Sequence, residues 1–257
     1  MNKKYKFDFH DTIAIEDGHM LYRIIALVDI GDAVKAGDKG GYIESGKNLS
    51  QLGDCWVGDN AQVYGNACVS GYALVSGNAQ VYGNVHVYGY AQVFGNAKVY
   101  GNAQIFEHAR IHESAKVHGN AKISGDSQVY GNAEVYEHAQ VFKYAEVYKN
   151  AKVYGNVEIY GAARIAGKAE VFGWAQVYDD GLVYGNAKIY GSAEVYEDAT
   201  VYGNAQVYES ARICGTAEVY DDMISGNEYV FTGPEGIMWK CPDRKNKGLH
   251  VIKSMET

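Results

Sequence analysis

The sequence repeats every six residues over most of its length. From Val57 to Val219 every sixth residue is Val or Ile, and the residue two places before it is small, usually Ala. One unit reads Ala-Lys-Val-Tyr-Gly-Asn, at residues 97–102. A period this strict constrains the fold more than any composition value. It indicates a solenoid of stacked identical elements that is held together by contacts between neighbouring repeats.

Each unit has the features of a short strand followed by a corner. Residues two apart point to the same face of a strand, so the small residue and the Val or Ile face inward together. The Tyr and the polar residue before Val then face outward, and Gly-Asn suits a tight corner. Four residues are too few for a hairpin sheet, so each strand must pair with strands one coil above and below. The chain has only 2 Pro in 257 residues, which fits strands that pair on both sides.

Hexapeptide units of this kind resemble the left-handed parallel β-helix, in which three units form one triangular coil. The resemblance implies an all-β fold and its left-handed coiling, and the 28 aliphatic positions would give about nine coils. The segment that leads into the repeats carries a more specific resemblance than the hexapeptide unit does. It contains LYRIIAL at residues 21–27, GGYI at 40–43 and NLSQLGDCW at 48–56. Over residues 21–61 it resembles YdcK-type proteins, which are bacterial and phage hexapeptide-repeat proteins often described as acyltransferases.

We expect three parts along the chain. Residues 1–50 would form an N-terminal cap with entry strands, 51–220 the repeat helix, and 221–257 a small C-terminal β cap. Caps of this kind cover the open strand edges of the end coils.

Within the caps, strands are expected at residues 5–9 and 20–28, and again at 229–231, 237–240 and 249–252. A turn at 233–236 and a basic loop at 244–247 would separate the last three strands. The first coil should begin around Ile43 and Leu49, placed on the small-residue register by counting back in sixes from Cys55.

Three units per coil give three outward columns, which we call side one (after Val57), side two (after Val63) and side three (after Val69). Side two is an unbroken ladder of rings, namely Tyr64, Tyr82, Tyr100, His118, Tyr136, Tyr154, Phe172, Tyr190 and Tyr208. Lys98, Lys116 and Lys152 lie beside it. The corner after side three, the third corner, has lost its Asn and carries Tyr72, Tyr90, His108, Asp126 and Tyr144. We expect its turn to have a different shape.

Three explanations of the ladders stay open. Stacked rings stabilise neighbouring coils by themselves, at about 0.2–1 kcal/mol a pair. A long column of rings could instead be buried between parallel copies of the chain, for example in a trimer. Rings beside lysines could also stack a base, nucleotide or sugar. The candidate ligand or interface residues are Tyr82, Lys98, Tyr100, Lys116, His118, Tyr136, Lys152 and Tyr154 on side two, and Tyr90, His108, Asp126 and Tyr144 at the third corner.

The resemblance implies a His base and an acyl-CoA donor at an inter-subunit groove, and His118 is the best candidate for the catalytic base. Acyltransferases of this fold often carry a loop between hexads, and this array has none from Val57 to Val219.

Residues share a column only when their numbers differ by multiples of 18. No two of the array histidines meet this condition, so we expect no metal site.

The sequence favours a non-catalytic scaffold or binding module. We expect it to form a homo-oligomer, with a trimer favoured, through its aromatic ladders. The alternatives are an acyltransferase, which alone would need acyl-CoA as cofactor, and a nucleotide or small-ligand binding protein, of bacterial or phage origin.

The net charge of −8 argues against extended nucleic-acid binding. The sequence has no apolar run long enough for a membrane helix and no secretory signal. Its four Cys lack disulfide-like spacing, which favours the cytoplasm.

Overall fold

The computed structural model describes residues 3–15, 18–232, 238–241 and 250–251. Every regular element among these residues is a β-strand. The chain divides into two compact units, Met1–Asn132 and Ala133–Thr257, and each is described by itself.

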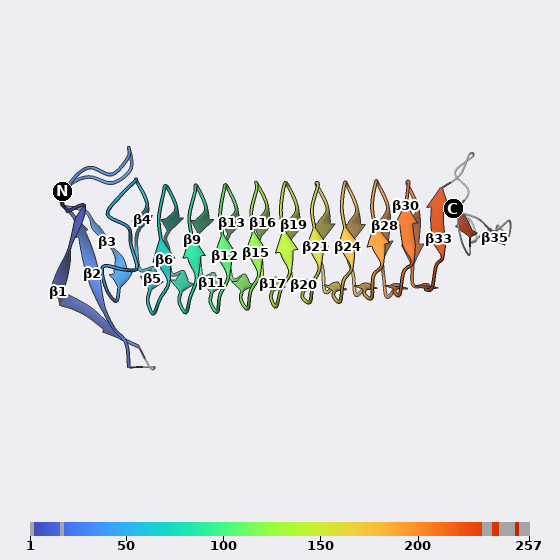
Figure 1. The fold of residues 1–257 in the computed structure, drawn as a ribbon, viewed down its shortest axis with the longest axis horizontal. Coiled ribbons are helices and arrows are strands. Elements are labelled where there is room, and N and C mark those ends of the chain that lie inside the picture. The colour runs from blue at the N-terminus through green and yellow to red at the C-terminus, as the bar shows by residue number, and fades with distance from the viewer. Residues whose placement is uncertain (1–2, 16–17, 233–237, 242–249, 252–257) are drawn as a thin grey trace. The chain divides into compact units, whose positions relative to one another are not determined.

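The first unit begins with three longer strands and continues with two-residue strands that repeat in threes (Figure 1). The longer strands are β1 (Tyr5–Ala14), β2 (Met20–Ala26) and β3 (Lys39–Ile43). Side one holds β4 (Trp56–Val57), β7 (Leu74–Val75), β10 (Gln92–Val93), β13 (Arg110–Ile111) and β16 (Gln128–Val129). Side two holds β5 (Gln62–Val63), β8 (Gln80–Val81), β11 (Lys98–Val99) and β14 (Lys116–Val117). Side three holds β6 (Cys68–Val69), β9 (His86–Val87), β12 (Gln104–Ile105) and β15 (Lys122–Ile123).

The second unit repeats the same pattern. Side two holds β17 (Glu134–Val135), β20 (Lys152–Val153), β23 (Glu170–Val171), β26 (Lys188–Ile189), β29 (Gln206–Val207) and β32 (Met223–Ile224). Side three holds β18 (Gln140–Val141), β21 (Glu158–Ile159), β24 (Gln176–Val177), β27 (Glu194–Val195), β30 (Arg212–Cys214) and β33 (Tyr229–Thr232), followed by β34 (Met238–Cys241) and β35 (His250–Val251). Side one holds β19 (Glu146–Val147), β22 (Arg164–Ile165), β25 (Leu182–Val183), β28 (Thr200–Tyr202) and β31 (Glu218–Tyr220).

Within each unit the strands of one side pair in parallel with those one coil away, and the register step is 18 residues throughout the strict array. The step is 20 residues between β3 and β5, and 17 residues where β32 and β33 join their sides. Val81 pairs with Val63 on one edge and Val99 on the other. The backbone amides bond to the next coil, as Gln80 N–H does to the Ala97 carbonyl at 2.9 Å. The predicted parallel β-solenoid with three strands per coil is therefore confirmed.

The coil count is slightly higher than predicted. In the described residues, side two runs through β3, β5, β8, β11 and β14 in the first unit and through six strands in the second. This makes about eleven turns instead of nine, because β3 and β32 lie outside the strict hexad and still pair with side two.

The inward face is closed to solvent. Ala97 and Val99 have no exposed surface, and neither have nearly all residues at the same two positions of the other units. The alternation of inward Ala and Val with outward polar and aromatic residues is therefore the one that the sequence predicts.

The corners turn on one residue with positive φ, and this residue precedes the Asn. It is usually Gly, but at the third corner Glu107, Lys143 and Asp179 adopt φ values of 58°, 61° and 54°. These values match Gly65 at a corner of the ordinary type, with φ of 64°. The expectation of a different turn at the third corner is therefore wrong, because the missing Asn was never the left-handed residue.

The Asn of the ordinary corners has another role. The side-chain amide of Asn66 donates to Asn84 Oδ1 at 3.0 Å, and Asn84 donates to Asn102 Oδ1 at 2.9 Å. Asn at this position therefore forms an exposed ladder of amide hydrogen bonds from coil to coil.

The first coil starts in a different register from the predicted one. Ile43 pairs with Val63, and Leu49 forms a bridge with Val69, so both occupy the aliphatic register and not the small-residue register. The chain between Leu49 and Val57 has two residues more than a hexad. Counting back in sixes from Cys55 therefore gives the wrong position.

Antiparallel strands close both ends. At the N-terminal end β1 pairs with β2 and β2 with β3, and β3 joins side two (Figure 1). At the other end β33 pairs antiparallel with β34, and β34 with β35; these strands overlap the segments 229–231, 237–240 and 249–252 in which strands are expected. The expected turn at 233–236 and basic loop at 244–247 lie outside the described residues.

Three polar side chains cap the first coil, one at each corner. The corner carbonyls of Gly53, Asp59 and Gly65 accept hydrogen bonds from different segments of the N-terminal part. The donors are Lys4 Nζ to Gly53 at 3.2 Å, Arg23 Nη1 to Asp59 at 2.9 Å and Asn48 Nδ2 to Gly65 at 3.1 Å. Side chains therefore replace the backbone donors that a preceding coil would supply.

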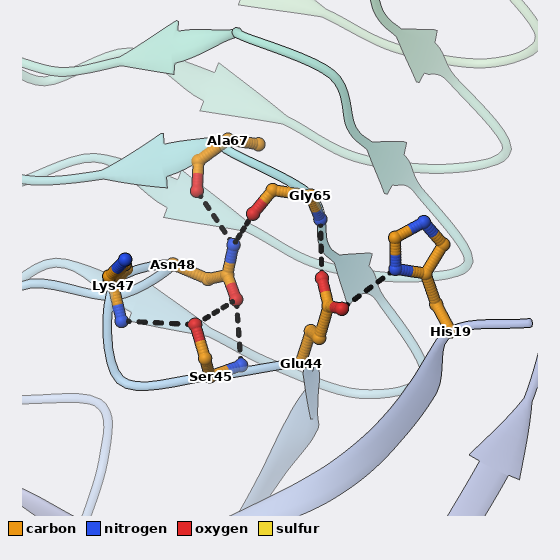
Figure 2. Close-up of polar contacts among 7 residues, drawn as sticks. All are labelled: His19, Glu44, Ser45, Lys47, Asn48, Gly65 and Ala67. Atoms are coloured by element: carbon orange, nitrogen blue, oxygen red, sulfur yellow. Dashed lines mark hydrogen bonds and ion pairs between the residues drawn. The ribbon is translucent and has the colours of Figure 1, made fainter.

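The fully buried Asn48 is the most enclosed of these caps (Figure 2). Its Nδ2 also donates to the Ala67 carbonyl at 2.9 Å, while its Oδ1 accepts from the Ser45 backbone at 2.8 Å. Beside it Glu44 bridges His19 Nδ1 and the Gly65 amide, both at 2.7 Å. Burial opposes ionisation of Glu44, but the bonds from His19 and Gly65 outweigh it and lower the pKa of this carboxyl.

We predict that Val135→Asp lowers the free energy of unfolding of the second unit by about 3–5 kcal/mol, because it places an unpaired charge in a dry core. Val135 has no exposed surface. Urea denaturation followed by circular dichroism measures the change. Glu134→Asp, at the outward neighbour in the same strand, should unfold at the same urea concentration as the wild type. If Val135→Asp also unfolds at the wild-type concentration, the inward register is wrong.

We also predict that Asn48→Ala destabilises the first unit by about 1–3 kcal/mol for each buried carbonyl that loses its donor. The control is Asn102→Ala in the exposed amide ladder. Water can replace the lost hydrogen bonds there, so the free energy of unfolding should fall by about 1 kcal/mol or less. Both are measured by urea denaturation. Equal losses in the two variants would contradict the capping role of Asn48.

Candidate functional site

In the first unit the rings of side two form a regular stack. Tyr64, Tyr82, Tyr100 and His118 follow each other at centroid distances of 4.9, 5.2 and 4.6 Å, with the planes within 7° of parallel. Tyr64 is buried against the N-terminal cap, and the others are half-buried because each ring covers its neighbour's face. The predicted ladder exists, but it presents ring edges to solvent and few ring faces.

In the second unit Tyr136 and Tyr154 stack at 4.9 Å and the ladder continues through Phe172. Burial, followed by the neighbouring Tyr154 and nearby carboxylates, raises the pKa of Tyr136 to about 12. Its phenol therefore stays protonated near neutral pH. Lys152 lies between Glu134 and Glu170 on neighbouring strands, so this lysine is surrounded by opposite charges.

The charge pattern beside the ladder differs in the first unit. Lys98 and Lys116 are direct partners on β11 and β14, and both are exposed. Like charges directly opposite each other destabilise a sheet. The outward strand residues from Trp56 to Gln128 include no acidic residue, whereas in the second unit Glu takes this position at 134, 146, 158, 170, 194 and 218.

The histidines are distributed as the sequence predicts. His118 stacks on Tyr100 within side two, and His112 stacks on Phe94 at 4.9 Å within side one. Burial lowers the pKa of His112, which favours its neutral ring. In the described part of the chain, no group of three or more His, Cys, Asp and Glu side chains could hold a metal ion.

The third corner of the first unit is the most exposed ring stack. Tyr72, Tyr90 and His108 stack at 4.8 and 5.0 Å. Tyr72 is 49% exposed and Tyr90 52% exposed. These rings take the place that Asn occupies at the other corners.

Two further exposed apolar side chains come from the segments that lead into this corner. Leu52, one residue before the corner Gly53, is 63% exposed, and Tyr88 of side three, which stacks on Phe106 at 5.2 Å, is also exposed. We call Leu52, Tyr72, Tyr88, Tyr90 and His108 the third-corner ridge.

The other two residues predicted at the third corner, Asp126 and Tyr144, do not belong to this ridge. Asp126 follows His108 at the third corner and is exposed, so the ring stack gives way to a carboxylate there. Tyr144 occupies the third corner of the second unit and is 66% exposed, but Ala162 and Asp180 follow it.

A hollow of about 360 Å³ opens on side one of the first unit. Its wall includes the outward residues Trp56, Gly58, Leu74 and Ser76 of the first two coils. The loop between β2 and β3 also lines it, with Ala33, Val34 and Asp38, as do Lys39 at the start of β3 and the corner residue Asp59.

Residues 61–78 and 79–93 match the model of the YdcK beta solenoid repeat. The chain carries YdcK β-solenoid repeats. The matched YdcK repeats follow the entry segment over residues 21–61, on which the resemblance in the sequence rests. None of the curated proteins matches the chain. Among the described residues, no helix is long and apolar enough to cross a membrane.

Sequence reasoning missed two parts of this solenoid. The capping side chains of Lys4, Arg23 and Asn48 come from the irregular N-terminal part, where no period reveals a partner. The hollow did leave a signal, because the ring column of side one lacks rings at Gly58 and Ser76. Only the fold of the loop over these two positions makes that gap a site.

Proposed function

We propose that this protein is a non-catalytic β-solenoid module that assembles with further copies of itself through the third-corner ridge. The observation that supports this most is the exposure of Tyr72 and Tyr90, which stack on each other while half of each side chain faces solvent. Large exposed apolar patches on soluble proteins mark interaction surfaces. Tyr is also among the residues enriched at interfaces.

The ridge is a better interface than the side-two ladder, although the ladder has the longer run of rings. Tyr82 and Tyr100 are only half-buried edges in a tight stack, and Tyr64 is already covered by the cap. Contact with another chain would add little apolar burial there. The ridge rings stand on a corner instead, where a partner can reach both their edges and their outer surfaces.

A second copy suits the ridge because the rings lie at the spacing of the coils. Two parallel copies would present rings at the same repeat of about 4.8 Å, so their ladders could interdigitate in register. Cyclic assembly around an axis parallel to the array brings the same corner of every copy together. We favour a trimer. The cytoplasm, which the cysteine pattern suggests, is the compartment that we propose for it.

We predict that Tyr72→Asn combined with Tyr90→Asn abolishes self-association and leaves the fold intact. Asn is the residue that the other two corners carry at this position, where it forms amide ladders. Light scattering after size-exclusion chromatography should give the wild type a mass of several chains and the double variant the mass of one.

The matched control is Tyr82→Gln, which removes a ring from the side-two ladder and should keep the assembly. Circular dichroism melting must show that both variants remain folded. A wild-type protein that stays monomeric at high concentration, or a double variant that still assembles, would refute the ridge as an interface.

A second candidate function is binding of an anionic aromatic ligand, such as a nucleotide, on side two of the first unit. It is favoured by the adjacent exposed Lys98 and Lys116 beside the stacked rings of Tyr100 and His118. Two ammonium groups would hold a phosphate, and a base would contact the exposed edges of the stacked rings.

We predict that ADP raises the melting temperature of the wild type but not that of Lys98→Gln with Lys116→Gln. Gln is the residue at the same position in the preceding coils, at Gln62 and Gln80, so the double variant should fold. Lys152→Gln on the second unit is the control and should respond like the wild type. No shift in the wild type would exclude this site for nucleotides.

The alternative function, acyl transfer with His118 as the base and acyl-CoA as the donor, is tested by an activity assay on the wild type. With a small amine or alcohol added as acceptor, chromatography would follow the conversion of acetyl-CoA to CoA together with the acetylated acceptor. Turnover by the wild type that falls about 100-fold or more in His118→Ala would support the enzyme and contradict a non-catalytic module.

A further inference from the structure

The ring column of side one is interrupted at its N-terminal end. Phe94, His112 and Tyr130 stack at 4.9 and 5.0 Å, but the two preceding positions are Ser76 and Gly58. Val75 and Val93 are strand partners, so the side chain of Ser76 lies one coil from the Phe94 ring. A planar group above Ser76 would therefore occupy the next level of the same stack.

The hollow described above lies at this interruption, since Gly58 and Ser76 both line it. Its volume of about 360 Å³ falls within the range of small-molecule sites, about 300–1,000 Å³. The side chains of Val34 and Leu74 give it apolar walls. A bicyclic aromatic ring has the size and polarity for this space.

Trp56 supplies a polar group at the floor. The indole is 95% enclosed because the cap covers it, as its Cζ2 atom lies only 2.6 Å from where a Cβ on Gly40 would stand. Its Nε1 atom lies 3.8 Å from the corresponding Cβ position of Gly58, next to the hollow. This N–H donates to no other group in the described part of the chain.

Two carboxylates line the hollow and each has bonding capacity left. Asp38 Oδ2 accepts from the Lys35 amide at 2.7 Å, and Asp59 Oδ2 accepts from the Gly77 amide at 2.8 Å. Within the described residues, Oδ1 of either carboxylate accepts no hydrogen bond. The one basic residue in the lining, Lys39, lies 3.6 Å from Asp11 and is partly neutralised by it. The hollow therefore favours a cation over an anion.

The loop wall is held in place by its own hydrogen bonds. Ile30 and Val34 bond to each other through both backbone amides, at 2.9 and 3.3 Å, and Asp29 Oδ1 accepts from the Ala36 amide at 3.0 Å. A site whose walls are fixed before binding loses less entropy when the ligand enters.

We propose that this hollow binds a small aromatic amine, whose ring occupies the level of the side-one stack next to Phe94 and whose ammonium group pairs with Asp38 and Asp59. The site is separate from the third-corner ridge and from the lysines of side two. It makes the N-terminal end of the solenoid a receptor for a cationic aromatic molecule.

The test is calorimetric titration of the full chain at pH 7 with tryptamine, and with indole-3-propionate as the anionic probe of similar size. We expect tryptamine to bind at least about tenfold more tightly, a difference of about 1.4 kcal/mol. Asp38→Asn combined with Asp59→Asn should remove this preference. Equal affinity for the two probes, or no binding of tryptamine, would overturn the proposal.

Ser76→Tyr tests the position of the ring. It places in side one the kind of residue that the same column carries at Phe94 and Tyr130, so it should fold, and it should weaken tryptamine binding at least about tenfold. The matched control is Ser70→Tyr, which fills the equivalent gap on side three and should leave binding unchanged. Wild-type binding by Ser76→Tyr, or equal losses in both variants, would place the ligand elsewhere and overturn the proposal.

Discussion

The structure depends on hydrogen bonds between coils. A strand of two residues cannot stand alone, so its amides must find carbonyls one coil away, as Gln80 does with Ala97. Both groups have to repeat at the same height in every coil, which requires an 18-residue step without insertions. Positive φ at one corner residue then returns the chain to the next side, and Lys143 shows that a residue other than Gly adopts it when the register demands it. The identical Ala and Val positions follow from the same step.

Such a ladder has unpaired groups at its ends, and the N-terminal part of the chain is built to satisfy them. Lys4, Arg23 and Asn48 reach one corner carbonyl each, from three segments that are far apart in the sequence. The cap has a second effect, because β3 covers Trp56 at Gly40, and the loop that leads into β3 borders a hollow against Gly58 and Ser76. End-capping and the candidate ligand site are consequences of the same segment.

The outward positions are free to vary, since the core and the backbone ladder do not use them. This freedom explains how one regular array carries different surfaces: stacked rings on side two, exposed rings at the third corner, and adjacent lysines at Lys98 and Lys116. In the second unit the same columns alternate in charge, as Lys188 and Glu170 do at 3.8 Å. The surfaces to which function is assigned, namely the third-corner ridge, the adjacent lysines and the hollow, all lie in the first unit.

The sequence by itself determined the strands, the inward residues and the ring columns, because each of these depends only on spacing, and a period of six reports spacing directly. It misplaced Ile43 and Leu49, since two extra residues before Val57 break the count. It also gave the third corner a different turn, because the sequence does not say which corner residue takes positive φ. Only the tertiary structure decided which rings are exposed and where the hollow lies. Exposure depends on what packs over a residue, and the covering segments, such as the loop against Ser76, come from the part of the chain that has no period.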